Sequence, residues 1–205
     1  MTQRLDYLPE TPSQTAGPYV HIGLAPGAAG FHTFAVELGQ TLAPAGVPGD
    51  RIHVEGVVLD ALGTPVKDIL IEVWQADANG IYPHPEDPRA ADCAAGFRGW
   101  GRVISDFDTG LFAFDTIKPG PTPGRNGRTQ APHLSLWLVS RGINIGLNTR
   151  MYFPEDADLH AADPVLSSIE QRVRVATLIA IATAPGRYRF DIRLQGDGET
   201  VFIDI

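Results

Sequence analysis

The chain has 205 residues, of which 43% are hydrophobic and 20% are charged, as in one ordinary globular domain. Its net charge of −8 excludes a general nucleic-acid-binding protein, because such proteins need a basic surface. The single cysteine, Cys93, excludes an internal disulfide, and the lack of a long apolar segment or a signal-like N-terminus predicts a cytoplasmic protein with no membrane partner.

Residues 1–30 contain several prolines and glycines and show little periodicity, which predicts an extended arm rather than a packed element. An arm of this kind needs a surface to lie on, either its own domain or a partner, unless it is simply a floppy terminus. We expect residues 1–50 to form this arm with loops that contact a partner subunit. Residues 51–205 are expected to form the core domain.

Short segments that alternate apolar and polar residues, or are rich in β-branched and aromatic residues, begin at residue 51. Their number and the turns between them predict an all-β fold, namely an antiparallel β-sandwich with long loops and the extended N-terminal arm. The expected strands are Arg51–Leu59, Ile69–Ala76, Leu111–Ile117, His133–Ser140, Thr149–Phe153, Val175–Ile181, Arg187–Leu194 and Glu199–Ile205.

Two long loops and one helix are expected between these strands. The loops run from Asp77 to about Trp100 and from Lys118 to Pro132, and loops of this length usually carry function or an interface. Asp163 and Pro164 precede a short helix over Val165–Gln171, with Asp163 as its N-cap and Pro164 at its first position. Turn residues at 195–198 predict a hairpin between the last two strands.

Several blocks of the sequence resemble the intradiol ring-cleavage dioxygenases. The most specific are LPETPSQTAGPYVHIG, which spans Leu8–Gly23, and EVWQADANG, which lies within Leu70–Tyr82. The resemblance extends over nearly the whole chain and implies the β-sandwich of that family. The other blocks that carry it are Thr116–Pro123, Pro132–Ser140, Arg141–Phe153 and Arg187–Ile205.

In that family two tyrosines and two histidines hold a ferric ion, and the resemblance places these ligand positions at Tyr82, Thr122, His133 and Ser135. Phenolate oxygen is a hard anionic donor that suits Fe(III), and imidazole completes the set. His133 and Ser135 are one residue apart, so both side chains face the same side of a strand. The hydroxyls of Thr122 and Ser135 are neutral at pH 7 and are poor ferric ligands, so we expect no metal site in this chain.

The lost ligands resemble those of the non-metal alpha type of subunit in this family, which implies a homologous beta subunit that carries the Fe(III). Gln130 stands where the catalytic chains have an arginine near the reacting ring. The resemblance implies that Arg141 lies in the partner's substrate pocket, beside the carboxylate of 3,4-dihydroxybenzoate. Thr15, Gly17 and Pro18 of the arm are expected in the same pocket. The resemblance also implies that O2 is the second substrate and that the subunits form a large hetero-oligomer.

Two other interpretations remain open. The chain is a scaffold or binding module that has lost catalysis altogether, or it is a self-sufficient enzyme that uses another metal geometry at Tyr82 and His133. Without the resemblance, Arg141 is simply a surface arginine at a strand end. The other acidic residues, serines and histidines show no metal-loop, nucleophile-elbow or paired spacing.

Overall fold

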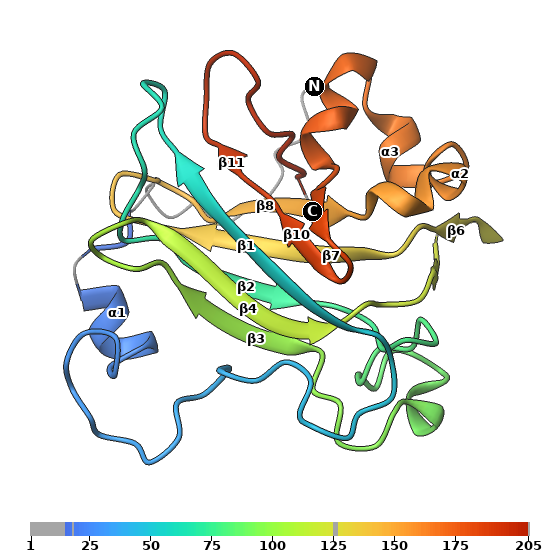
Figure 1. Ribbon diagram of the computed structural model, residues 1–205, viewed down its shortest axis with the longest axis horizontal. Coiled ribbons are helices and arrows are strands. Elements are labelled where there is room, and N and C mark those ends of the chain that lie inside the picture. Colours follow the sequence, from blue (N-terminus) through green and yellow to red (C-terminus); the bar gives the residue numbers. More distant parts are fainter. Residues whose placement is uncertain (1–14, 18, 125–126, 205) are drawn as a thin grey trace, which may run out of the picture.

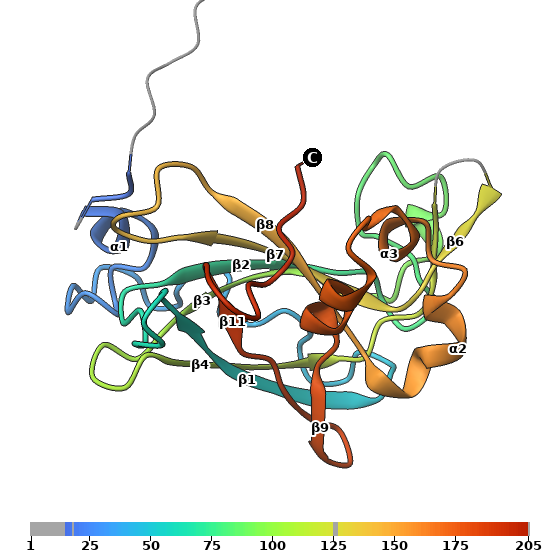
Figure 2. The same ribbon diagram turned by 90° about the horizontal axis from the view of Figure 1, so that it is seen from above.

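The computed structural model describes residues 15–17, 19–124 and 127–204, and its body is formed by two packed β-sheets (Figures 1 and 2). The first sheet has the order β11-β1-β10-β9, with β4 also paired to β1, and the second has the order β3-β2-β7-β8. The all-β sandwich is therefore confirmed. The first sheet comprises β1 (Arg51–Leu59), β4 (Leu111–Ile117), β9 (Ile181–Ala184), β10 (Arg187–Arg189) and β11 (Ile192–Arg193). The second comprises β2 (Leu70–Trp74), β3 (Trp100–Ile104), β7 (His133–Val139) and β8 (Leu147–Tyr152).

The connections contain the helices and one small additional ladder. The ladder joins β5 (Thr122–Pro123) to β6 (Thr129–Gln130) within the second long loop. Helices are short and lie outside the sheets (Figure 1). They are α1 (Tyr19–Leu24), η1 (Ala90–Asp92), η3 (Pro154–Asp156), α2 (Ala157–His160), α3 (Pro164–Ser168) and η4 (Arg172–Leu178).

The hydrophobic core lies between the two sheets and is filled by alternate residues of each strand. Ile52 and Val54 point inward from β1, and Leu134, Leu136 and Leu138 point inward from β7. Successive side chains of a strand point to opposite faces. The intervening residues of β7 therefore face outward, and this outer face carries the candidate site.

Most of the expected strands form where the alternation is strongest. β1 and β4 have the expected bounds, and β2, β7 and β8 differ from expectation by one or two residues at their ends. The helix after Asp163 also forms, and the Asp163 carboxylate accepts hydrogen bonds from the backbone N–H groups of Val165 and Leu166, as an N-cap does. It ends at Ser168, three residues before the expected end.

The expectation for residues 175–181 is wrong, because most of this segment belongs to the 3₁₀ helix η4. It touches β8 through a single bridge between Ile179 and Tyr152, so no ladder forms. The hydroxyl of Thr177 donates to the carbonyl of Arg174, which stabilises a helical turn instead. Tertiary packing thus overrides the strand propensity of these β-branched residues.

The expectation of a hairpin between the last two strands is also wrong. The expected turn at 195–198 does return the chain to β11, where the Thr200 N–H donates to the Arg193 carbonyl. The chain then crosses to the other sheet, where the Ile203 N–H donates to the Asn148 carbonyl of β8. Residues 199–204 therefore bridge the two sheets and form no strand.

Further details differ from the sequence prediction. β3 was not expected as a strand, and the expected strand Arg187–Leu194 is divided into β10 and β11. β1 pairs in parallel with β10 and β11, so the first sheet is mixed rather than purely antiparallel. The N-terminal arm contains helix α1, so it is not extended throughout. The boundary at residue 50 stays a prediction, although Leu42 already packs into the sandwich core.

Candidate functional site

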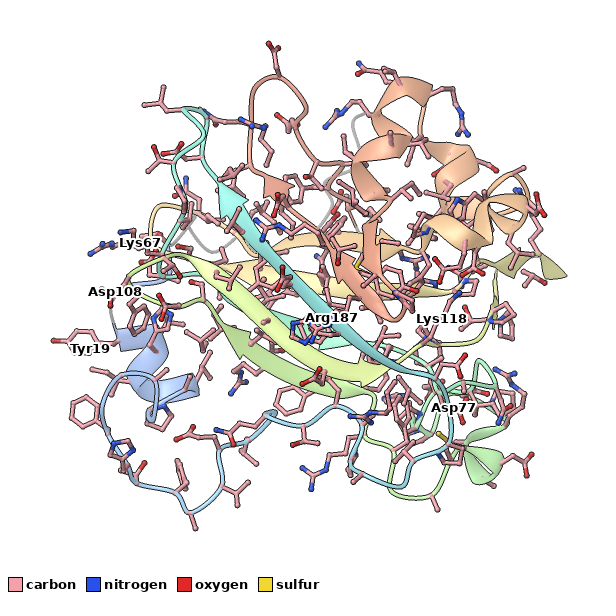
Figure 3. All side chains as sticks on the ribbon, in the orientation of Figure 1. Tyr19, Lys67, Asp77, Asp108, Lys118 and Arg187 are labelled. Atoms are coloured by element: carbon pink, nitrogen blue, oxygen red, sulfur yellow. The ribbon has the colours of Figure 1, made fainter. Side chains whose placement is uncertain are left out.

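The two long loops are held together by close backbone contacts. The carboxylate of the fully buried Asp77 accepts hydrogen bonds from the backbone N–H groups of Asn79, Ile81 and Ala94, at 2.9 Å each. Its carbonyl accepts from the N–H of Gly120 in the second loop, also at 2.9 Å. Figure 3 shows Asp77 and Lys118 at the same end of the sheets. Asp77 thus organises the first loop and attaches the second to it.

Glycines on both loops make this approach possible. A Cβ on Gly80 would lie 1.9 Å from the carbonyl oxygen of Pro121, and one on Gly120 would lie 2.5 Å from the carbonyl oxygen of Ala78. Gly80 also has a φ of +73°, in the left-handed region that favours glycine. The approach of these two backbones brings the loop residues Tyr82 and Thr122 to the same place.

Tyr82 and His133 face one another at this end of the molecule. The Tyr82 hydroxyl lies 3.5 Å from His133 Nε2, and the Tyr82 ring stacks on Trp74. His133 Nδ1 lies 2.7 Å from the carbonyl oxygen of Ala131, so Nδ1 carries the proton and Nε2 presents its lone pair. Burial, with a smaller effect of Arg150, lowers the pKa of His133 to about 4. Burial also raises the pKa of the Tyr82 phenol, so both side chains are neutral at pH 7.

A hydrogen-bonded network surrounds this pair. Gln130 Nε2 donates to the Thr122 hydroxyl at 3.4 Å, and Gln130 Oε1 accepts from Arg150 at 2.7 Å. Arg150 also donates to the hydroxyl of Tyr152, which donates to Asp163. The resemblance did not point to Arg150. Its place follows from the register of β7 and β8, in which it lies directly opposite Ser135, and short motifs do not contain that register.

Ser135 points outward from β7, on the same side of the strand as His133, as expected. It lines a cavity of about 310 Å³ that adjoins the Tyr82–His133 pair, together with Trp74, Trp100 and Trp137. The structure therefore groups Tyr82, Thr122 and His133 at one point, with Ser135 beside them. A second cavity, of about 370 Å³, is lined by the Trp74–Tyr82 stack with His84, Arg89 and Pro123.

This donor set does not fit a ferric ion. Such a centre needs several anionic or imidazole donors, whereas only the Tyr82 oxygen and His133 Nε2 are of the required types. The Thr122 hydroxyl is already an acceptor for Gln130, and the Tyr82 phenol is neutral. Within residues 15–17, 19–124 and 127–204, no group of three His, Cys, Asp or Glu side chains is placed to hold a metal. The absence of a metal site stays a prediction.

The expected pocket residues gather at the other end of the second sheet. The Thr15 hydroxyl accepts a hydrogen bond from the N–H of Gly142 at 2.7 Å, which attaches the arm to the turn that follows β7. Arg141 lies in this turn with 70% of its side chain exposed. The carbonyl of Gly17 accepts from Val20 at the start of α1. Pro18 lies outside the described residues.

The two groups of residues are separated by the length of β7. His133 begins this strand, and Arg141 follows its end by two residues. At about 3.3 Å per residue, that places them roughly 25 Å apart. Thr15 and Arg141 therefore do not line the cavities beside Tyr82 and His133 of their own chain.

The chain belongs to a dioxygenase family. The family described as "Dioxygenase" matches residues 35–196, which is most of the chain. This is the family of the intradiol ring-cleavage dioxygenases. Among solved structures, catechol 1,2-dioxygenase from Acinetobacter sp. ADP1 has a TM-score of 0.59 at 20% identity. That match covers 80% of this chain and 60% of the other and shows a shared fold.

Curated relatives narrow the similarity further. The chain is 48% identical to the protocatechuate 3,4-dioxygenase alpha chain of Pseudomonas putida, over 98% of each chain. It is 38% identical to the protocatechuate 3,4-dioxygenase beta chain of Burkholderia cepacia, over 74% of this chain and 67% of that one. None of the helices in the described part of the chain has the length and apolarity that a bilayer crossing requires.

Proposed function

We propose that this chain is the alpha subunit of a protocatechuate 3,4-dioxygenase that acts in the cytoplasm as a large hetero-oligomer. The Fe(III) of the complex belongs to a homologous beta subunit. The complex cleaves 3,4-dihydroxybenzoate between its two hydroxylated carbons, and each of these carbons gains one oxygen atom from O2. The product is 3-carboxy-cis,cis-muconate.

The observation that carries this proposal is the placement of Arg141 and Thr15. Both lie on the surface, about one strand length from the residual Tyr82–His133 pair. An exposed arginine beside an anchored arm supports a contribution to a pocket completed by another chain. The guanidinium of Arg141 suits the substrate carboxylate, because it offers paired N–H donors to the two oxygens.

The role of this chain in the reaction is to bind and orient. Arg141 holds the carboxylate, while Thr15, Gly17 and Pro18 of the arm close one wall of the pocket and exclude water. The neutral Tyr82 and His133 hold no substrate in this proposal, and the hydrogen bonds from Gln130 and Arg150 replace metal coordination as the support of these loops.

Iron content and ring-cleavage activity test the division of labour between the subunits. We expect the chain purified alone to contain no stoichiometric iron and to leave 3,4-dihydroxybenzoate uncleaved. Co-expression with the homologous beta subunit is expected to give both. Stoichiometric iron in the chain alone, with activity, would instead support a self-sufficient enzyme with another metal geometry at Tyr82 and His133.

The Arg141→Ala variant of the complex separates a pocket residue from a pure scaffold. We expect the KM for 3,4-dihydroxybenzoate to rise about tenfold to a hundredfold, because a charge-assisted hydrogen bond to a carboxylate contributes about 1.5–3 kcal/mol. The closed polar network at the old ligand positions favours the scaffold alternative. That alternative predicts an unchanged KM and an unchanged kcat in steady-state kinetics.

A further inference from the structure

Asp68 lies near Arg141 at one end of the second sheet. β2 and β7 pair antiparallel, with Leu70 opposite Val139 as the last pair at this end. Asp68 lies in the turn before β2, and Arg141 lies in the turn after β7. The pairing of these two strands therefore brings the two turns to the same end of the sheet.

The two oxygens of the Asp68 carboxylate contact two consecutive residues. Oδ1 accepts a hydrogen bond from the hydroxyl of Ser140 at 2.8 Å, and Ser140 is fully buried. Oδ2 lies 3.7 Å from Nε of Arg141, which is close enough for attraction between charges though too long for a hydrogen bond. The buried hydroxyl fixes the carboxylate, and the fixed carboxylate attracts one edge of the guanidinium.

The same turn is held from its other side by the arm. Thr15 accepts from the N–H of Gly142 and lies 3.5 Å from the carbonyl of Ser140. The backbone on both sides of Arg141 is thus anchored, while its side chain remains 70% exposed. Orientation of that side chain depends on what attracts the guanidinium.

An ion pair this exposed contributes little to stability. Its effect is instead on the direction in which the Arg141 side chain points. Arginine has five N–H donors, and the closest approach of Asp68 to the guanidinium is at Nε. With the side chain this exposed, donors of the terminal amino groups can reach a second carboxylate. A guanidinium already directed toward its ligand loses less side-chain entropy on binding.

We propose that Asp68 is a positioning residue that directs Arg141 toward the carboxylate of 3,4-dihydroxybenzoate in the partner's pocket. This inference rests on the proposed function, since it requires that Arg141 contact the substrate. Asp68 itself contacts no substrate. Its carboxylate acts through the guanidinium.

Asp68 also lies near a titratable group, His21, and the experiment must separate any effect on His21 from the effect on Arg141. The ring of His21 in α1 is buried and packs edge-on against Phe107. Burial lowers the pKa of His21, and the Asp68 carboxylate raises it. A change at Asp68 therefore also alters the electrostatic surroundings of α1. Asp68→Asn is the suitable variant, because the amide keeps the shape and the acceptor for Ser140 while removing the charge.

The experiment uses the complex with its beta subunit and two ring compounds. 3,4-dihydroxybenzoate is the substrate, and catechol, which has the two hydroxyls but no carboxylate, is the competitor. We expect Asp68→Asn to raise the KM for 3,4-dihydroxybenzoate about three- to tenfold. The inhibition constant of catechol and kcat should remain within about twofold of wild type. In an Arg141→Ala background, Asp68→Asn should add nothing to the KM.

Asp108→Asn is the matched control, because it removes one negative charge near Lys67, the chain neighbour of Asp68, as Figure 3 shows. It is expected to leave both constants unchanged. An equal loss of affinity for both compounds in Asp68→Asn would indicate disturbed packing and overturn the inference. No effect of Asp68→Asn, with a large effect of Arg141→Ala, would overturn the inference alone. No effect of Arg141→Ala would overturn the proposed pocket role and the inference with it.

Discussion

The Asp77→Ala variant is expected to lose at least about 3 kcal/mol of its free energy of unfolding. The substitution removes a buried carboxylate that accepts hydrogen bonds from three backbone N–H groups. Hydrogen bonds to a charged acceptor contribute about 1.5–3 kcal/mol each, and the N–H groups left behind are poorly reached by water. Urea denaturation of the wild type and the variant measures the loss.

Asp106→Ala is the control for this prediction. Asp106 accepts hydrogen bonds from the N–H groups of Asp108 and Thr109 and from the Thr109 hydroxyl, but it is exposed. Water can replace its oxygen, so its loss is expected to cost much less. Equal losses in the two variants would show that burial of the Asp77 carboxylate is not what stabilises the loops.

The second large effect is a dependence of stability on pH that comes from His133. Folding lowers the pKa of this imidazole from 6.5 to about 4, so the folded protein favours the neutral form. The unfolded chain binds the proton more tightly, and stability therefore falls as the pH decreases from about 6.5 to about 4. The difference between these pKa values corresponds to about 3 kcal/mol.

A His133→Gln variant isolates this contribution, because glutamine does not titrate. We expect its free energy of unfolding to depend less steeply on pH than that of the wild type between about pH 4 and 6.5. His32→Gln, at an exposed histidine, is expected to retain the wild-type slope. Parallel curves for wild type and His133→Gln would contradict the prediction.

Strand alternation predicted much of the sandwich, because one face of each central strand is buried. The pattern in β1 and β4 reproduced their bounds, since these strands form the longest continuous ladder of the first sheet. The same pattern misled at residues 175–181, where the β-branched residues form only one bridge to β8 and pairing in a ladder starts at Ile181. Pairing partners distant in the sequence decide such segments, and local propensity does not contain them.

The site could be predicted only as far as short motifs extend. Resemblance located Tyr82, Thr122 and His133, which the structure brings together. Short motifs did not point to Arg150, because its place follows from the strand opposite it, or to Asp68, because its contacts are with a turn distant in the sequence. Asp77 resembled any other turn aspartate until its burial was known. Roles that depend on register or burial need the folded chain.

The close approach of the loops at Gly80 and Gly120 has a consequence for how such a protein can diverge. Backbone contacts fix the outline of this region, and the donor side chains at positions 82, 122, 133 and 135 only fill it. Shape and chemistry are therefore inherited through different positions. After duplication of a gene, one copy can lose its donors by single substitutions while each intermediate still folds.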